Sequence, residues 1–433
     1  MFTHMKNFLA AISLGRTPDS RLNLSVAIGS TVVRQVVASG LYFIAVSITT
    51  RQLGPHHNGL LATLMLLPQT LYAFLNLGLG PSHVYHLSSG SGNHHDMRRM
   101  NWMMAFGLWL AVVVMLVVSG EKNIEKYLPG TDKNSALYAS VLFPLMLLGA
   151  WSSSLLQGSR DYLAYNRTLL IQPLVFCTGI LCCSVLNAIT VISVLTCSMV
   201  SQMSLWLLSE AKARKIATPL GNKPHKFVDT VKFGLRSHLS NIITFMNYRI
   251  ALYLVSFKLG AAAAGEYALS IQLAEALWLI SSAASMIVFP ESAAHNKSPA
   301  ELDRMIKKIA GSVFRLTFAG ALLAAAVFPF AIPWVFGQAY RGSVVPLLIL
   351  LPGIVAWSYM SVLSNSLAGI GSQNVNIRAA LLCLSINISG SMLAIPRFGA
   401  AGAALASTLG FSATALYTIV MYRKIMRARL KLS

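Results

Sequence analysis

The sequence predicts an all-α polytopic membrane protein with about 12 transmembrane helices in two six-helix bundles. Three observations predict this fold class. Hydrophobic residues make up 55% of the chain and charged residues only 11%, whereas a soluble domain carries about a quarter charged residues. The apolar runs are continuous, which disfavours the alternating pattern of a β-barrel. The two halves of the chain also share an internal repeat.

Twelve apolar runs are each long enough to cross a bilayer, which takes about 20 helical residues. They span residues 24–50, 58–84, 100–120, 136–157, 168–186, 188–209, 234–257, 265–290, 309–330, 343–367, 378–395 and 400–421. The segment before the first run carries Lys6, Arg16 and Arg21 but no small-residue cleavage site after an apolar core. We therefore expect a retained cytoplasmic tail and not a cleaved signal peptide.

The formal net charge of +21 indicates how the chain is oriented. With the N-terminus inside, most Lys and Arg residues fall in the inside segments, so the positive-inside rule places both termini in the cytoplasm. The basic stretch Lys212–Arg236 separates the halves and predicts three parts: a bundle at 1–209, a linker at 210–233 and a bundle at 234–433. We expect this linker to lie on anionic membrane lipids and to bind no nucleic acid.

The internal repeat consists of three matches that fall at similar membrane boundaries. They pair Leu53-Gly54 and Gly59 with Leu259-Gly260 and Gly265, Leu156, Gly158 and Arg167 with Leu367, Gly369 and Arg378, and Arg214-Lys215 with Arg423-Lys424. Each half has an even number of spans, so the halves share one orientation and should be related by an axis along the membrane normal. Such parallel repeats around a central cavity are typical of alternating-access transporters.

Several side chains have a plain structural interpretation. Prolines interrupt spans 2, 4, 5 and 10 and are expected bending points: Pro68, Pro144, Pro173, Pro346 and Pro352. The five cysteines lie in apolar stretches without a CxxC pair, which predicts core-filling residues. The run from His94 to Asp96 has no third ligand at helical spacing, so we expect a solvated turn, no metal site and no cofactor.

Four stretches resemble a known family. They are RQLGPHHNGLLATLMLLPQTLYAFLNLGLGPSHVYH (Arg51–His86), Gly265–Ala293, Pro352–Arg378 and Ile395–Thr408. In this order they are similar to Wzx-type polysaccharide flippases. The resemblance implies the MATE/MOP-like fold of the multidrug/oligosaccharidyl-lipid/polysaccharide exporter superfamily. It also implies a polyprenyl (undecaprenyl)-diphosphate-linked glycan as substrate, the bacterial inner membrane as location, and a polysaccharide polymerase or other assembly machinery as partner.

One departure from the family pattern concerns span 7. Many relatives have an acidic residue shortly after the span-7 arginine, where this chain reads Tyr248-Arg249-Ile250-Ala251. A coupling role of that carboxylate therefore does not transfer to this chain.

Two arginines inside the spans are the candidate substrate-binding residues. Arg34 lies ten residues into span 1, about 15 Å deep at the helical rise, and Arg249 lies eight residues before the outer end of span 7. A central Arg costs about 2.5–3.5 kcal/mol on insertion scales, so it needs a partner. A guanidinium suits a diphosphate because its planar fork donates bidentate hydrogen bonds. The alternative is that each arginine pairs with Glu275 or caps backbone carbonyls.

Acidic residues offer a candidate site of ion coupling. Glu275 lies ten residues into span 8 and predicts either a proton or Na⁺ site or a structural partner of Arg249, with no preference between the two. We expect Glu266, at the outer boundary, to be solvated. Arg315 lies only six residues into span 9 and should snorkel to the cytoplasmic headgroups.

Polar side chains on the same spans are candidate contacts for the sugars or the cation. They are Gln35, Gln69 and Asn76 in the first half and Asn241, Asn247, Tyr248 and Gln272 in the second. Amides and hydroxyls also bond between helices, and we expect at least half of this set to be structural.

The function that these observations favour is translocation of the lipid-linked oligosaccharide to the outer leaflet by alternating access. The alternative is a MATE-like, cation-coupled exporter of small organic cations, although two arginines against one glutamate disfavour a cationic substrate. We expect no enzyme, because the longest outside loop, about 121–135, offers carboxylates without a His or nucleophile. The inside segments also lack a nucleotide-binding glycine loop.

Overall fold

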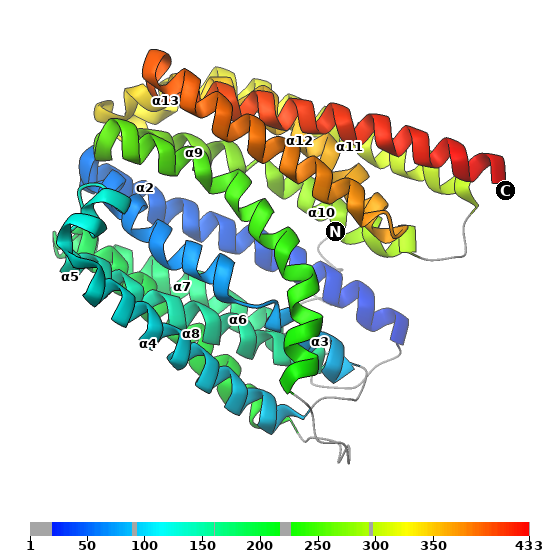
Figure 1. Cartoon of the computed structure of the whole chain (residues 1–433), viewed down its shortest axis with the longest axis horizontal. Helices are drawn as coiled ribbons and strands as arrows, with labels where there is room; N and C mark the ends of the chain where they lie inside the picture. Colours follow the sequence, from blue (N-terminus) through cyan, green and yellow to red (C-terminus); the bar gives the residue numbers. More distant parts are fainter. Residues whose placement is uncertain (1–19, 89–92, 160, 217–226, 294–297, 433) are drawn as a thin grey trace, which may run out of the picture. The chain divides into compact units, whose positions relative to one another are not determined.

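The computed structural model describes residues 20–88, 93–159, 161–216, 227–293 and 298–432 (Figure 1). In these ranges every regular element is a helix. The elements of the first half are α2 (Ser20–Leu75), α3 (Leu79–Ser88), α4 (His94–Tyr127), α5 (Lys133–Ser140), α6 (Leu142–Gly158), α7 (Tyr162–Val185) and α8 (Val191–Ala213). Those of the second half are α9 (Phe227–Glu275), α10 (Trp278–Ala293), α11 (Pro299–Val335), the 3₁₀ helix η1 (Gln338–Ser343), α12 (Val344–Gly369) and α13 (Gln373–Leu432).

Four of these helices contain a non-helical glycine. In α4 it is Gly120, close to the end of the helix at Tyr127, whereas in α2, α9 and α13 it lies between two long arms. Gly54 in α2 has φ 69° and ψ 172°, Gly260 in α9 has φ 82° and ψ −175°, and Gly399 in α13 has φ 58° and ψ −140°. Glycine adopts a positive φ without the steric cost that a Cβ imposes. The helices α2, α9 and α13 therefore each have two arms. Nine helices of the described residues are long and apolar enough to cross a membrane, and counting the arms separately gives twelve segments, as expected.

The described chain forms two compact units. Unit 1 contains residues up to Thr49, Phe74–Val118 and Leu137–His238, and unit 2 contains Thr50–Ala73, Ser119–Ala136 and the chain from Leu239 onward. The predicted bundle boundaries at 209 and 234 stay a prediction, and the middle of the basic linker, residues 217–226, lies outside the described residues.

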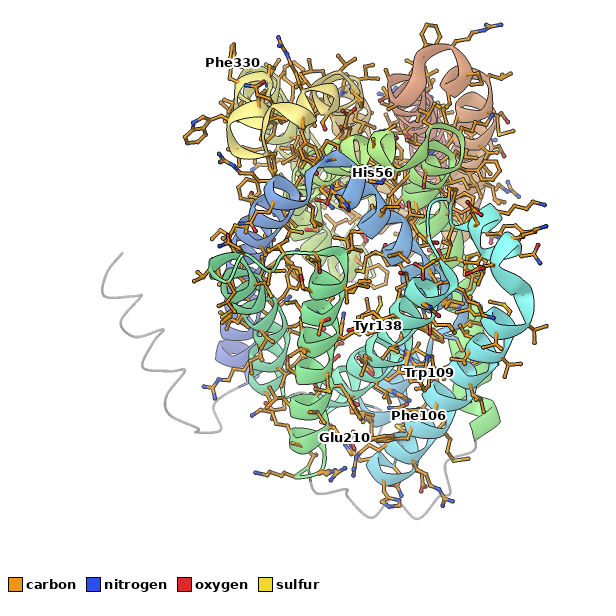
Figure 2. The ribbon with its side chains drawn as sticks, turned by 90° about the vertical axis from the view of Figure 1, so that its left-hand side faces the viewer. His56, Phe106, Trp109, Tyr138, Glu210 and Phe330 are labelled. Atoms are coloured by element: carbon orange, nitrogen blue, oxygen red, sulfur yellow. The ribbon has the colours of Figure 1, made fainter. Side chains whose placement is uncertain are left out.

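Unit 1 is built around α6, which contacts α3, α7 and α8. Its side chains are almost completely buried, among them Trp151 and Leu155. Aromatic side chains line α4: Trp102 stacks on Phe106 with ring centroids 5.4 Å apart, and it meets Trp206 of α8 edge-on at 4.7 Å. Figure 2 shows Phe106, Trp109, Tyr138 and Glu210 of this unit. Trp151 and Trp206 are buried whereas Phe106 is 42% exposed, so the buried tryptophans contribute more to the packing of this unit.

Unit 2 is built around α12, which contacts α10, α11 and α13. One apolar cluster includes Tyr267 of α9, Leu350 and Ile354 of α12 and Ala403 of α13. A second cluster includes Ile306 of α11 and Tyr422 and Met426 of α13. These clusters fix the helices that surround the cavity described below.

A close helix crossing inside unit 2 joins the repeated glycines of the two halves. The second arms of α2 and α9 meet at Gly59 and Gly265. A Cβ on Gly59 would overlap the carbonyl of Ala261, and a Cβ on Gly265 would overlap that of Pro55. Only glycine allows backbones to approach this closely.

Polar contacts flank the same crossing. Asn58 Nδ2 donates to the Gly265 carbonyl at 3.4 Å, and the Thr63 and Ser256 hydroxyls lie 2.7 Å apart. The repeated motif is thus a packing motif whose two copies contact each other.

The interruptions of spans 2 and 8 do not come at prolines. Pro68, Pro173 and Pro352 lie inside continuous helices. The chain instead leaves the helical path after Leu75, before α3 begins, and after Glu275, before α10 begins. Neighbouring turns can satisfy the backbone groups that a helix loses at a proline, which accounts for the unbroken helices.

Candidate functional site

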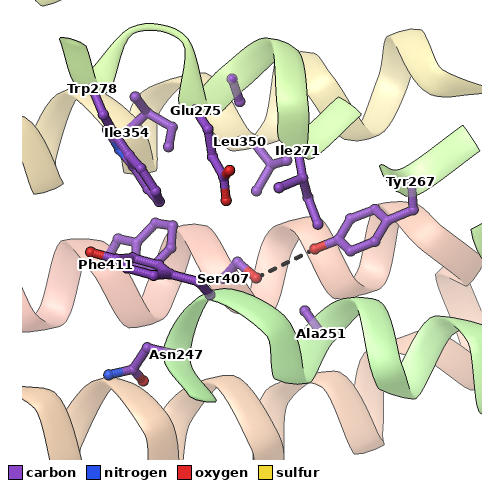
Figure 3. Close-up of a pocket in the computed structure, with 12 residues that line it drawn as sticks. Asn247, Ala251, Tyr267, Ile271, Glu275, Trp278, Leu350, Ile354, Ser407 and Phe411 are labelled. Carbon is purple, nitrogen blue, oxygen red and sulfur yellow. Dashed lines mark hydrogen bonds between the residues drawn. The ribbon is translucent and has the colours of Figure 1, made fainter. Parts of the chain in front are cut away.

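A small cavity in unit 2 is enclosed by α9, α10, α12 and α13 (Figure 3). Its volume is about 20 Å³, which accommodates about one water molecule. The lining residues are Asn247, Tyr248, Ala251, Tyr267, Ile271, Ala274, Glu275, Trp278, Leu350, Ile354, Ser407 and Phe411. Figure 3 shows Glu275 and Tyr267 pointing into it. Three of the predicted site residues, Asn247, Tyr248 and Glu275, are therefore brought together here.

Arg249 and Glu275 form an ion pair beside this cavity. Arg249 Nη1 lies 3.2 Å from Glu275 Oε1, and the two side chains are 29% and 23% exposed. Glu275 is the last residue of α9, directly before the turn that leads to α10. Arg249 and Glu275 therefore pair with each other, which is the structural alternative stated above for both residues.

An aromatic wall closes the cavity on one side. The Tyr248 and Trp278 rings lie 4.6 Å apart, the Tyr248 and Trp357 rings 5.7 Å, and the Trp357 and Phe411 rings 5.0 Å. Two polar atoms at the cavity, Trp278 Nε1 and Asn247 Oδ1, are buried without a hydrogen-bond partner among the described residues. A buried donor and a buried acceptor of this kind are each costly unless a ligand or water satisfies them.

A chain of hydrogen bonds holds α9 against α13 at the same place. Asn247 Nδ2 donates to the Ala380 carbonyl at 3.0 Å, and Asn387 Nδ2 donates to the Asn247 carbonyl at 3.2 Å. The Ser407 hydroxyl donates to Asn387 Oδ1 at 3.3 Å and lies 3.5 Å from the Tyr267 hydroxyl. Asn387 and Ser407 are not among the residues predicted for the site, although each is a polar side chain inside an apolar span.

Arg34 lies in the first arm of α2, in unit 1. It is half-buried, and its Nε atom is buried without a hydrogen-bond partner among the described residues. It interacts electrostatically with Tyr165 of α7, and no described carboxylate forms an ion pair with it. Arg34 therefore keeps a donor group for which the described protein supplies no anion.

Arg34 and Arg249 stand at different levels of their helices. Arg34 precedes Gly54 by 20 residues and Arg249 precedes Gly260 by 11 residues. At 1.5 Å per residue these separations are about 30 Å and about 16 Å.

The two arginines are therefore not equivalent in the repeat. At the offset that relates Gly54 to Gly260, Arg34 corresponds to Ser240 and Arg249 to Phe43.

The other predicted residues are spread more widely. Gln35 and Gln69 are half-buried in α2, and Gln272 is exposed on α9. Asn76 Oδ1 accepts a hydrogen bond from the Gly78 amide at 2.9 Å, which stabilises the break between α2 and α3. Asn241 is in α9, but its side chain lies outside the described residues.

A second ion cluster, absent from the sequence-based expectations, lies in unit 1. Arg98 Nε and Nη2 both lie 2.6 Å from Glu210 Oε1, and the Glu210 side chain is only 5% exposed. Ser152 donates to the other carboxylate oxygen at 3.3 Å, and Arg214 Nε lies 3.6 Å away. Glu210 follows an apolar span directly, where a single carboxylate gives no indication of burial.

Some boundary residues depart from expectation. His94 is buried and its Nε2 lies 2.9 Å from the Ser159 hydroxyl, so the expected solvated turn is wrong for this residue, because α6 ends against the start of α4. Glu266 is half-buried and so only partly solvated, because its carboxylate packs beside Gly342 in η1. Arg315 is exposed and donates to the Ser312 hydroxyl at 3.4 Å.

The cysteines divide into two groups. Cys177 and Cys383 are buried, as expected of core-filling residues, whereas Cys182 is exposed and Cys183 and Cys197 are half-buried.

Comparison with known proteins places the chain in a family. Residues 48–345, more than half of the chain, match the model of a family described as polysaccharide biosynthesis protein. The chain belongs to this polysaccharide biosynthesis family. No curated protein sequence matches the chain.

Several solved structures of transporters share the fold of this chain. An inward-facing multidrug resistance MATE family transporter of the MOP superfamily has a TM-score of 0.73 at 14% identity, covering 93% of this chain and 99% of its own. The lipid II flippase MurJ in an inward closed conformation has a TM-score of 0.72 at 15% identity, covering 92% and 90%. A MOP superfamily transporter from Pyrococcus furiosus has a TM-score of 0.69 at 13% identity, covering 93% and 96%.

The predicted fold class is confirmed by these likenesses. The protein is a multi-pass membrane protein with the fold of MOP superfamily transporters.

Proposed function

We propose that the protein is a flippase that moves a polyprenyl-diphosphate-linked oligosaccharide from the cytoplasmic to the outer leaflet of the bacterial inner membrane. Membership of a polysaccharide biosynthesis family supports a glycan substrate. The fold shared with a lipid II flippase and with MATE transporters supports transport across the membrane by alternating access. No chemical step on the substrate is part of this proposal.

The single observation that carries the proposal is Arg34. A guanidinium inside a membrane helix is costly unless a partner neutralises it, and Arg34 is half-buried with no described carboxylate beside it. A diphosphate supplies the missing anion and matches the planar donor fork. Arg34 lies about 30 Å along α2 from Gly54, which is about the thickness of the hydrocarbon core. With both termini cytoplasmic it would therefore lie nearer the cytoplasmic end of the span than the depth of about 15 Å expected from the sequence, where it would meet a headgroup entering from the cytoplasm.

The alternative of a small organic cation finds less support in unit 2. Aromatic rings and a carboxylate together suit a cation, and Tyr248, Trp278 and Glu275 line the cavity. However, the Glu275 carboxylate already has a cationic partner, because Arg249 Nη1 lies 3.2 Å from Glu275 Oε1. A cationic substrate would first have to displace a guanidinium that is tethered to the same helix.

Coupling by H⁺ or Na⁺ at Glu275 remains part of the proposal, since Glu275 lines the cavity. A polysaccharide polymerase or other assembly machinery, and anionic lipids at the basic linker, are the proposed partners.

The proposal is tested in a strain that lacks the gene, by extracting polyprenyl-linked glycans and determining their leaflet. We expect complete oligosaccharide units to accumulate on the cytoplasmic leaflet, and wild-type protein to reverse this. Arg34→Ala should fail to reverse it, whereas Arg315→Ala, which removes an exposed arginine of α11, should succeed. If no lipid-linked glycan accumulates and no redundant gene explains it, the glycolipid substrate is wrong.

A further inference from the structure

We propose that Glu275 and the substrate diphosphate are alternative ligands of Arg249, so that substrate binding replaces the Arg249–Glu275 ion pair. This inference rests on the proposed function, because it takes the diphosphate as the anion. It adds a role for Glu275, whose carboxylate balances the charge of the binding arginine while the substrate is absent.

The geometry of the pair is that of an exchangeable contact. Arg249 and Glu275 are joined by one pair of atoms at 3.2 Å, and both side chains keep more than a fifth of their surface exposed. Bidentate pairs with short distances are the strong ones. The single contact leaves most of the five N–H donors of the guanidinium available to another anion.

The Arg98–Glu210 pair in unit 1 shows what a permanent pair looks like in the same chain. Two nitrogens of Arg98 approach one carboxylate oxygen at 2.6 Å, Ser152 donates to the other oxygen, and Glu210 is 5% exposed. An incoming anion would have to displace a carboxylate that is almost completely buried and held by three side chains. The contrast between the two pairs indicates exchange at Arg249 and structure at Arg98.

The surroundings of Glu275 also favour exchange over simultaneous binding. The adjacent cavity has a volume of about 20 Å³, which is enough for about one water molecule and too little for a phosphate group. Glu275 lines this cavity and Arg249 does not, so a phosphate that approaches Arg249 from the side of the cavity must take the place of the carboxylate. Glu275 can withdraw because it ends α9, and the chain turns before α10 begins at Trp278.

The cavity that Glu275 lines also contains a hydrogen-bond donor without an acceptor in the described part of the chain. Trp278 lines the cavity, and its buried Nε1 has no acceptor among the described residues. A phosphate oxygen accepts hydrogen bonds readily, so Trp278 Nε1 can add to the donors of Arg249.

The exchange has a consequence for charge. Once the diphosphate neutralises Arg249, the Glu275 carboxylate stands beside an apolar and aromatic wall without a counter-ion, which is unfavourable. A proton or cation that binds Glu275 at that moment completes the exchange. Substrate binding would in this way make the Glu275 carboxylate available to a proton or cation. While the substrate is absent, the carboxylate is paired with Arg249 and is not available.

The test is a binding titration of purified, lipid-reconstituted protein with farnesyl diphosphate as a short polyprenyl diphosphate probe. Glu275→Gln removes the competing charge, so the probe should bind about tenfold more tightly than to wild type, in the usual range of coupling between two ligands. Arg249→Ala should weaken binding, and the double variant with Glu275→Gln should bind no better than Arg249→Ala alone. Glu210→Gln, which alters the permanent pair, should leave the affinity of folded protein unchanged.

The possible results separate this inference from the proposed function. If wild-type protein binds the probe through Arg34, as loss of binding in Arg34→Ala would show, but Glu275→Gln binds no more tightly, the competition is wrong and the flippase proposal stands. If no variant binds the probe, both the diphosphate site and the competition are wrong. Glu275→Asp, with a shorter side chain, serves if Glu275→Gln fails to fold, and should also bind the probe more tightly than wild type.

Discussion

Gly59 and Gly265 pack backbone against backbone, each occupying the space that a side chain on the other helix would need. They are the same position of the repeated motif, one from each half of the chain, and they bring the second arm of α2 into unit 2. The repeat therefore creates a crossing between its two copies. Substitutions at these two glycines measure how much the crossing contributes to the stability of the protein.

Substitution at the crossing should destabilise the protein. In Gly59→Leu the side chain would overlap the Ala261 carbonyl, which is backbone and cannot rotate away. Overpacking of this kind costs about 1–3 kcal/mol or more, so thermal unfolding in detergent should come at a lower temperature. Gly107→Ala is the matched control, because a Cβ there meets nothing within 4 Å. An unchanged unfolding temperature in Gly59→Leu would contradict the close packing.

The turn at Gly260 should require glycine for a different reason. A Cβ at this position meets no neighbour within 4 Å, but φ is +82°. Gly260→Ala should therefore destabilise by about 1–2 kcal/mol through backbone strain alone. With ψ at −175° Gly260 lies outside the left-handed helical region that asparagine tolerates and in a region essentially restricted to glycine. Gly260→Asn should therefore destabilise at least as much as Gly260→Ala in the same unfolding assay. Equal stability of both variants and wild type would mean that α9 is not turned here.

The buried cluster at Glu210 should contribute strongly to stability. Glu210→Ala leaves the guanidinium of Arg98 without its carboxylate partner in a site where Glu210 is 5% exposed. Removing one partner of a buried ion pair costs about 3–5 kcal/mol. Chemical denaturation should show this loss, and Asp96→Ala, whose side chain is 52% exposed beside His95, should show much less. Equal losses would contradict the burial of Glu210.

Asn387 should be needed to hold α13 against α9. In Asn387→Ala the Asn247 carbonyl loses its donor at 3.2 Å and the Ser407 hydroxyl loses its acceptor. Unsatisfied buried groups cost about 1–3 kcal/mol each. Thermal unfolding should therefore shift downward, whereas Asn123→Ala, at an exposed helix position, should have little effect. A stable Asn387→Ala protein would show that these bonds add nothing net.

The sequence predicts the helices of this fold better than their interruptions. Continuous apolar runs identify all twelve segments because length and hydropathy alone decide which helices can cross a bilayer. The Leu-Gly motif predicts the repeat, and Gly54 and Gly260 have nearly the same backbone angles. The break after Leu75 lies at the turn-forming residues Asn76 and Gly78. The break after Glu275 carries no such signal, because neighbouring helices determine where a helix can lose its hydrogen bonds.

The candidate site could be predicted only in part. Asn247, Tyr248 and Glu275 meet at one cavity because their spans pack together. The sequence does not identify the partner of Glu275, because only the packing of the helices brings Arg249 within reach of the carboxylate. Asn387 and Ser407 come from α13, far along the chain, and no spacing rule joins them to α9.

The most direct test of the flippase proposal is a flipping assay in proteoliposomes with a fluorescent polyprenyl-diphosphate oligosaccharide. Wild-type protein and Arg315→Ala should expose the labelled lipid on the opposite leaflet. Arg34→Ala should not, and Arg34→Lys, which keeps the charge without the planar fork, should be slower than wild type. Flipping by Arg34→Ala at the wild-type rate would contradict the anion site on which the proposal rests.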